Sequence, residues 1–269
     1  MTTKSFRVYF YQVNEGVKGE TFNALKAIST HGTQVHREYE VRDVSISGSV
    51  AKGVLARLRD DAPHKREANG KEVELDIKDD ESLIEKSYFI YYSTLKLLVW
   101  QYNKSTGSVH NLSDYLSAFG SAAVTFDAIP NKKVINKIAT GNFKRLEIGL
   151  AKPKAAASYP ADDFRAGEMK RLSSFGGDKV FVQMYAAEGL TMSKVKSAIK
   201  LLQSDANTVA LKVKMDNETD VIDLLADVVK SRITVQMDGR YPKPDAIWSE
   251  LNKAKDKHKD ELSEYTSNN

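Results

Sequence analysis

Strand-like and helix-like patterns of apolar residues are mixed along this chain, and the mixture limits the folds that it can adopt. Phe6, Val8 and Phe10 alternate with more polar neighbours, which is the period of two typical of a β-strand. Leu112 and Leu116 are four positions apart and fall on one face of a helix. We therefore predict an α+β fold, with mixed sheets, flanking helices and a long C-terminal helix.

The same patterns, together with glycine, proline and asparagine signals, place the other elements. The polar segment 60–70 reads as a loop, and the segment 151–160 (AKPKAAASYP), with two prolines, is the best linker candidate. We expect an N-terminal α+β region (1–78), a central α+β region (79–150) and a C-terminal α+β region (151–269), forming one or two compact domains. The predicted strands are 6–13, 34–46, 71–77, 88–92, 95–102, 122–129, 143–150, 179–185, 208–215 and 232–237, and the predicted helices are 20–29, 49–59, 111–119, 131–139, 161–172, 191–203, 221–230 and 245–265.

Charge is distributed unevenly along the chain. The stretch from Lys132 to Lys214 has sixteen Lys or Arg and seven Asp or Glu, a net charge of +9, whereas the whole chain carries +4. Such a block attracts polyanions, of which nucleic acid is the commonest large one in a cell. Solvated faces of amphipathic elements are the alternative, although ordinary solvated faces mix both signs.

Lysine outnumbers arginine in this block and few aromatic residues interleave with it. That composition favours phosphate contacts over base reading or stacking, so we expect DNA binding with little sequence preference. The candidate DNA-binding residues are Lys132, Lys133, Lys137, Lys144, Arg145, Lys152, Lys154, Lys170, Arg171, Lys194, Lys196, Lys200, Lys212 and Lys214.

Motifs for catalysis and for metal or cofactor binding are weak or missing in the sequence. The chain has no cysteine, no glycine-rich phosphate loop, no GxSxG motif and no histidine pair at metal-binding spacing. We predict no cofactor and no metal site. A metal-dependent nuclease is an alternative, because such enzymes hold their metal ions with clustered carboxylates. Asp76 belongs to an acidic-x-Lys triplet (residues 74–78), and Asp60, Asp61 and residues 79–81 lie nearby in the sequence. An amphipathic strand between acidic turns produces the same pattern by chance.

The ends of the chain add two expectations. The sequence contains no apolar run of the ~20 residues that a membrane helix needs, and its N-terminus does not read as a signal peptide, so we expect a cytoplasmic protein. In the predicted helix 245–265, Trp248 and Leu251 lie on a broad apolar stripe. This helix either packs on the body of the protein or is a dimerisation helix with Trp248 and Leu251 as anchors.

The element order and several short segments resemble the RexA exclusion proteins of temperate phages and, in fold, the KwaB-type subunits of bacterial anti-phage systems. The resemblance covers about residues 75–265. It is carried by residues 79–83 (DDESL), 87–103 (SYFIYYSTLKLLVWQYN), 112–116 (LSDYL) and 143–154 (FKRLEIGLAKPK). It implies a dimeric, sequence-nonspecific binder of double-stranded DNA that senses phage DNA and reports to a membrane protein.

We expect a phage-exclusion or anti-phage defence protein that binds double-stranded DNA as a homodimer and is not an enzyme. The nuclease remains the first alternative. The second is an interaction scaffold or regulator whose basic face binds an acidic protein, such as a DNA mimic made by a phage.

Overall fold

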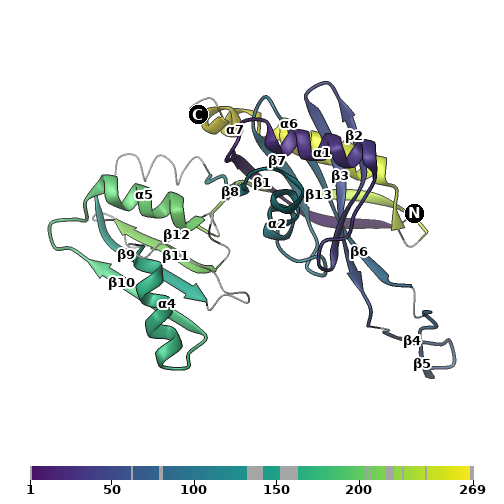
Figure 1. The fold of residues 1–269 in the computed structure, drawn as a ribbon, viewed down its shortest axis with the longest axis horizontal. Helices are drawn as coiled ribbons and strands as arrows, with labels where there is room; N and C mark the ends of the chain where they lie inside the picture. Colours follow the sequence, from purple (N-terminus) through teal and green to yellow (C-terminus); the bar gives the residue numbers. More distant parts are fainter. Residues whose placement is uncertain are drawn as a thin grey trace. The chain divides into compact units, whose positions relative to one another are not determined.

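The computed structural model describes residues 2–61, 63–78, 81–131, 142–151, 163–203, 205, 207–215, 221–225, 227–239 and 241–266. The protein has the mixed α+β fold that the sequence predicts. It divides into two compact units: unit 1 comprises residues 1–126 and 230–269, and unit 2 comprises residues 127–229. Unit 2 is thus an insertion within unit 1, between the blue-green and yellow-green parts of the chain (Figure 1). This division differs from the three regions expected from the sequence.

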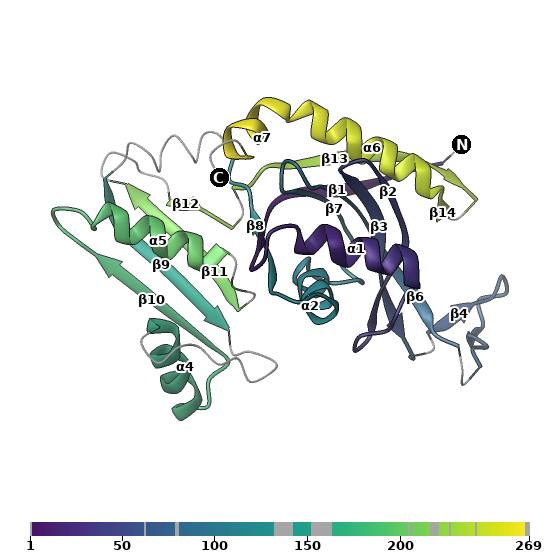
Figure 2. The same ribbon diagram turned by 45° about the horizontal axis from the view of Figure 1, so that its top comes forward.

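Unit 1 is built on one large curled sheet (Figures 1 and 2). Its strands run in the order β14-β13-β1-β7-β6-β3-β2, all neighbours are antiparallel, and β8 also pairs with β1. A small separate hairpin, β4 (His64–Arg66) with β5 (Glu72–Glu74), follows β3. The bounds are β1 Thr3–Glu15, β2 Tyr39–Ser47, β3 Val50–Arg59, β6 Leu83–Tyr92, β7 Leu97–Tyr102, β8 Val124–Ala128, β13 Lys230–Asp238 and β14 Tyr241–Pro242.

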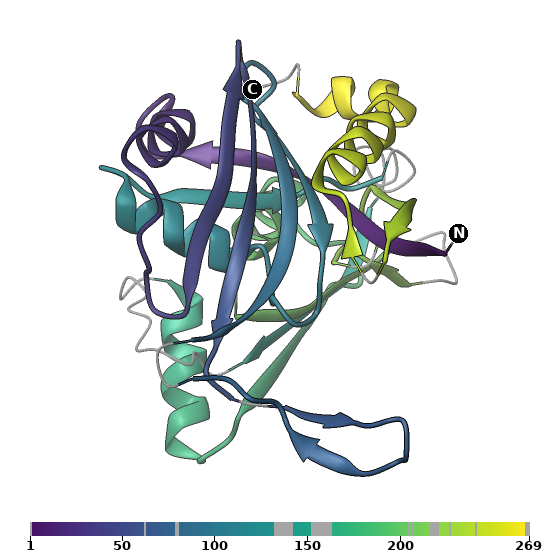
Figure 3. The ribbon, with the colours of Figure 1, turned by 90° about the vertical axis from the view of Figure 1, so that its right-hand side faces the viewer.

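Helices cover both faces of this sheet (Figure 3). Helices α1 (Glu20–His31) and α2 (His110–Phe119) pack on one face, and α6 (Pro244–Lys257) packs on the other. The second half of β6, residues 87–92, is therefore buried on both sides. Phe89 and Tyr91 point into the core under α1 and α2, whereas Tyr88 contacts Trp248 of α6, with ring centroids 5.8 Å apart. Burial on both faces explains why residues 88–92 read as a continuous apolar run.

Strand β3 corrects a prediction, because residues 49–59 do not form a helix. Val54 and Leu55 fit helical spacing, but both are fully buried where β3 lies between β2 and β6. A strand covered on both faces gives an apolar run that periodicity does not distinguish from a helix. Gly53 supports the strand, since a Cβ there would lie 2.7 Å from Cζ of Phe89.

Unit 2 contains a four-stranded antiparallel sheet in the order β10-β9-β11-β12. Its bounds are β9 Phe143–Ala151, β10 Lys179–Tyr185, β11 Thr208–Met215 and β12 Val221–Asp223, with helices α4 (Phe164–Ser174) and α5 (Met192–Gln203). The predicted helix 221–230 is wrong: its first residues form β12, and Lys230 begins β13 of unit 1. The predicted helix 131–139 lies outside the described residues except for Asn131.

The chain enters and leaves unit 2 through two segments that lie side by side. The backbone N–H of Val229 donates to the carbonyl of Ile129 at 2.7 Å, and that of Asn131 donates to the carbonyl of Asp227 at 3.1 Å. Pro130 and Val228 form a β-bridge between the same segments. The two connections therefore make a short paired stalk.

The single long C-terminal helix is also a wrong prediction. Helix α6 ends at Lys257, and a separate helix α7 (Lys259–Thr266) follows. His258 stands at the break, with φ −104° and ψ 17°. Its ring contacts that of Phe10, and its Nδ1 lies 2.8 Å from a carboxylate oxygen of Glu261.

Trp248 and Leu251 are anchors of α6 on the sheet of its own unit. Trp248 is 8% exposed and Leu251 is fully buried. The Nζ of Lys52, from β3, lies over the Trp248 ring, 4.5 Å from its centroid. Of the two interpretations that the sequence left open, the structure supports a helix that packs on the body of the chain, and it leaves these two side chains little surface for a partner.

The variant Leu251→Ala should lower the free energy of unfolding of unit 1 by about 2–5 kcal/mol, because it removes a fully buried side chain and leaves a cavity. Urea unfolding followed by tryptophan fluorescence measures the change. The exposed neighbour Lys253→Ala should stay within about 0.5 kcal/mol of the parent. A Leu251→Ala protein with unchanged stability but a halved mass in solution would instead identify Leu251 as a dimer contact.

Candidate nucleic-acid interface

The sheet of unit 2 has one face covered by helices. Val195, Ile199 and Leu202 of α5 pack against a row of alternate apolar residues on β9 and β11. Helix α4 joins the same core through Met169. Side chains alternate across a strand, so the residues between those apolar positions lie on the opposite face. We call this surface the open face; it consists of Arg145, Glu147, Gly149, Phe181, Gln183, Tyr185, Ala210, Lys212, Lys214, Val221 and Asp223.

Two aromatic rings are exposed on the open face. Phe181 is 57% exposed and Tyr185 is 65% exposed, and both belong to the edge strand β10. Gly149 lies opposite Phe181 in the strand pairing, and a Cβ there would be 2.7 Å from Cε1 of the ring. The missing side chain lets the Phe181 ring lie close against the sheet, so its other side faces solvent.

Charged and polar residues fill the rows beside these rings. The guanidinium of Arg145 pairs with Glu147 and lies 5.6 Å from the centroid of the Tyr185 ring. Gln183 donates to the Glu147 carboxylate at 2.9 Å and accepts from the Tyr185 hydroxyl at 2.8 Å. These contacts orient Tyr185 and connect it to the centre of the face.

Glu147 is the acidic centre of the open face. The adjacent Arg145 guanidinium holds the pKa of Glu147 below its usual value, and Lys212 contributes with its Nζ 3.7 Å away. Lys214, next to Arg145 in the strand pairing, has no ion pair with a described carboxylate. The face therefore combines two exposed rings with three cations and two carboxylates, Glu147 and Asp223. Glu147 partly neutralises Arg145 and Lys212.

The predicted DNA-binding residues do not all converge. Three of them, Arg145, Lys212 and Lys214, lie together on the open face. Lys144 lies beside them on β9, and its Nζ donates to the carbonyl of Ala187. Lys170, Arg171 and Lys194 are exposed on α4 and α5, which cover the other face of the sheet. Lys196 and Lys200 belong to α5, but their side chains lie outside the described part, as do residues Lys132, Lys133, Lys137, Lys152 and Lys154 entirely.

The boundaries of unit 2 also change the charge balance that the sequence indicates. Unit 2 includes residues 127–131 and 215–229 as well as the basic block, and these add six carboxylates and no cation. Unit 2 as a whole has sixteen basic and thirteen acidic residues, a net charge of +3. The +9 block thus overstates the attraction of this unit for a polyanion.

Phe181 and Tyr185 are the candidate residues that sequence reasoning missed. The strand 179–185 was predicted with its correct bounds, and its residues Phe181, Gln183 and Tyr185 share one side of it. Both sides of this strand carry apolar residues, so the alternation alone does not show which side faces solvent. The packing of α5 and α4 decides this.

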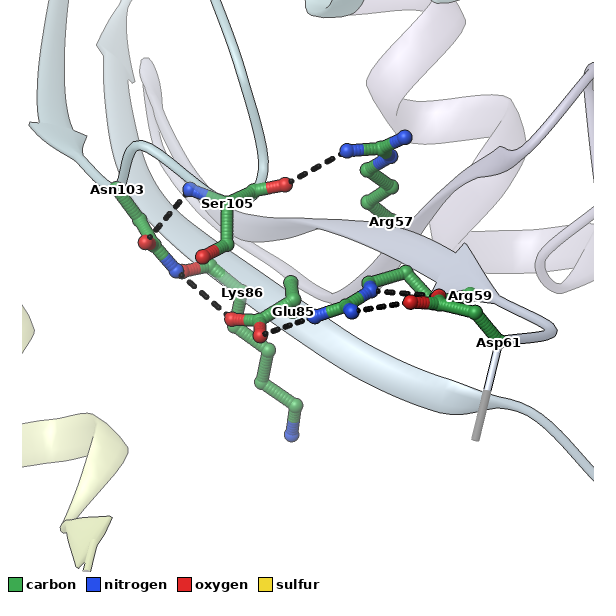
Figure 4. Close-up of polar contacts among 7 residues, drawn as sticks. All are labelled: Arg57, Arg59, Asp61, Glu85, Lys86, Asn103 and Ser105. Carbon is green, nitrogen blue, oxygen red and sulfur yellow. Dashed lines mark hydrogen bonds and ion pairs between the residues drawn. The ribbon is translucent and has the colours of Figure 1, made fainter. Parts of the chain in front are cut away.

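The nuclease alternative gains no support from the described carboxylates. Glu74 and Asp76 are exposed at the small β4–β5 hairpin, and Asp79 and Asp80 lie outside the described residues. Asp61 is bound by Arg59, whose Nε and Nη2 lie 2.9 and 2.5 Å from its two oxygens, which lowers the pKa of Asp61 (Figure 4). Within the described ranges no group of three or more His, Asp or Glu residues could hold a metal ion.

Arg59 belongs to a network of polar contacts that joins β3, β6 and the segment after β7 (Figure 4). Its Nη1 lies 3.4 Å from Glu85, and the other oxygen of Glu85 accepts from Asn103 at 3.3 Å. Arg57 donates to the carbonyl of Ser105 at 3.2 Å and to Glu38 at 3.1 Å. Each arginine here is paired with a carboxylate, so the network ties strands together and leaves little unpaired charge.

Arg165 shows that one cation of the basic block is structural. It is 9% exposed, and its guanidinium binds Asp163 at 2.6 Å and Asp205 at 2.8 Å. Asp163 also caps α4 by accepting from the backbone N–H of Arg165 at 2.9 Å. The pairing with Arg165 lowers the pKa of the Asp163 carboxyl.

A family comparison covers most of both units. Residues 52–262 match the model of a family of unknown function, DUF6731. The chain therefore belongs to the DUF6731 family. A search of curated proteins finds no match. Within the part of the chain that the structure describes, no helix is long and apolar enough to cross a membrane.

Asp163→Asn should destabilise unit 2 at neutral pH by about 1.5–3 kcal/mol, the usual contribution of a hydrogen bond to a charged group. The folded-state pKa of Asp163 is lowered, so its contribution is complete above the unfolded value of about 3.9 and is lost as the pH falls through the folded value. The stability difference between parent and variant should stay constant from pH 7 to about 5 and shrink toward pH 3. Urea unfolding at a series of pH values measures it.

The exposed Asp178→Asn is a matched control for this titration and should change stability little at any pH. A difference for Asp163→Asn that is absent at pH 7, or that grows below pH 4, would contradict the assignment.

Proposed function

We propose that unit 2 binds nucleic acid without sequence preference, and that single strands are its preferred form. The observation that carries the proposal is the exposure of Phe181 and Tyr185 on the same open face as Arg145, Lys212 and Lys214. Aromatic rings beside basic residues are the usual means by which proteins hold unpaired bases, because every base can stack on a ring. The sequence predicted binding of duplex DNA. An exposed ring on a sheet contributes less to binding a duplex, because the paired bases are not free to stack on it.

The spacing of the two rings suits a strand laid along β10. Residues four apart on a strand lie about 13 Å apart on the same side. Phe181 and Tyr185 could therefore each carry a base, while the backbone of the ligand passes over β9 and β11. There Lys212 and Lys214 point to the same side, two residues apart on β11.

Sequence preference should be weak because the cations near the rings suit phosphates. Lysine acts on phosphate as a point charge, and Arg145 is already engaged with Glu147 and the Tyr185 ring. Affinity should therefore fall as the salt concentration rises. A plot of log affinity against log salt concentration should have a slope of about −0.7 for each phosphate of the single strand that a protein cation neutralises.

Phe181→Ala and Tyr185→Ala should each weaken single-strand binding about 5- to 150-fold, since a stacked base contributes about 1–3 kcal/mol. Fluorescence anisotropy with two unrelated labelled oligonucleotides, and with the duplex of one of them, measures the affinities at low and moderate salt. Phe175→Ala is a matched control, because this ring is 89% exposed at the end of α4, away from the open face.

Absence of binding to any of these probes at low salt would refute the proposal. Tighter binding of the duplex with no effect of either aromatic variant would refute the single-strand preference and favour the phosphate binding predicted from the basic block. Equal losses for Phe175→Ala and Phe181→Ala would show that the open face is not the site.

Glu147→Gln should strengthen binding about fivefold at low salt, because it removes the carboxylate that partly neutralises Arg145 and Lys212. This corresponds to the ~1 kcal/mol that two unit charges about 4 Å apart contribute in water. The gain should disappear at high salt. Glu188 is an exposed acidic residue between β10 and α5, and the control variant Glu188→Gln should not strengthen binding. An equal gain in affinity for Glu188→Gln would show that the net charge of the protein, and not the position of Glu147, causes the effect.

The roles in phage exclusion and anti-phage defence, the homodimer and the membrane or acidic protein partners rest on the resemblance and on the basic block. They stay predictions, as does the cytoplasmic location.

A further inference from the structure

A second basic surface lies in unit 1, outside the basic block of residues 132–214. It is a hollow of about 570 Å³ whose lining includes Arg7, Tyr9, Lys230, Arg232, Lys257 and His258, and the described residues that line it include no Asp or Glu. We call it the basic hollow. Its residues come from the first strand, from β13 and from the end of α6, so only the fold brings them together.

Strand pairing places like charges opposite one another in this hollow. Arg7 is directly opposite Arg232 in the antiparallel pairing of β1 with β13, and Tyr9 is opposite Lys230. Like charges in directly opposed positions destabilise a sheet. Among the described residues, no ion pair joins Arg7, Arg232 or Lys257 to a carboxylate. A bound anion would remove this repulsion.

The side chains of the hollow define the chemistry of that anion. Each guanidinium presents several donors in a plane, which matches the oxygens of phosphate, and Lys257 adds a point charge. His258 lies at the border, where Glu261 already occupies its Nδ1. The volume is far larger than the ~30 Å³ of one water molecule and falls in the range of ligand sites, so a group of several linked phosphates fits.

We propose that the basic hollow of unit 1 is a binding site for a compact polyphosphate, such as the triphosphate group of a nucleotide or an inorganic triphosphate. The site does not depend on the nucleic-acid binding proposed for unit 2, because it uses different residues in a different unit. Arg7, Arg232 and Lys257 line this hollow without an ion pair to any described carboxylate. This distinguishes it from the Arg57 and Arg59 network, in which each arginine is paired.

Isothermal titration of the full-length protein with sodium triphosphate at low salt tests the proposal, with sodium sulfate at matched ionic strength as the second probe. We expect saturable binding of one triphosphate per chain and no comparable binding of sulfate. Arg7→Gln and Arg232→Gln should each weaken triphosphate binding at least tenfold. Neither should lower the melting temperature, since both residues are exposed and each change removes half of a repulsive pair.

Arg66→Gln is the matched control, because Arg66 is an exposed arginine on β4 of the same unit. Phe181→Ala should bind triphosphate as the parent does. Absence of triphosphate binding, equal binding of sulfate, or equal weakening by Arg66→Gln would overturn the proposal by showing diffuse attraction only. Loss of triphosphate binding in Phe181→Ala would also overturn the proposal, because it would place the bound anion on the open face of unit 2. Only this last result bears on single-strand binding by unit 2.

Discussion

The pairing of β1 with β13 is the interaction on which the rest of the molecule depends. Seven residues of β1 pair with seven of β13, from Thr3 with Gln236 to Tyr9 with Lys230. This pairing joins segments more than two hundred positions apart and completes the sheet of unit 1. It gives α6 a strand to pack on, and it assembles the basic hollow from residues of both ends of the chain. It also makes unit 2 an insertion, because the chain must leave unit 1 and return to form β13.

Most strands could be predicted from the sequence, because a half-buried strand shows its period directly. The bounds of β10 and β11 were predicted correctly, and those of β1, β9 and β13 lay within the observed strands. The failures have physical causes. Strand β3 is buried on both faces and therefore shows no alternation. The apolar residues of 221–230 are divided between β12, the turn that follows it, and the segment at Val228 and Val229 that pairs with Ile129 and Pro130. The break at His258 is set by contacts with Phe10 and Glu261, which no local pattern shows.

The candidate sites depended more on tertiary structure than the elements did. Arg145, Lys212 and Lys214 were predicted as contacts, and their common face follows from strand alternation once β9 and β11 are known to pair. The two aromatic rings could not be recognised as exposed, because Phe181 relies on the close approach that Gly149 allows on a neighbouring strand. The basic hollow could not be predicted from the sequence, because Arg7 lies in a near-neutral region of the chain and Arg232 and Lys257 lie in an acidic one.

The paired stalk of unit 2 has a consequence for how this chain can change over time. The hydrogen bonds between Ile129 and Val229, and between Asn131 and Asp227, hold the entry and the exit of unit 2 together. For unit 1, the hundred or so residues between them act as a loop whose ends are already joined, so the insertion adds little closure entropy. Domains whose ends lie close together tolerate insertion into another domain. Unit 2 therefore meets the geometric condition for an inserted domain, because its two ends are held together and the β1–β13 pairing can form around it.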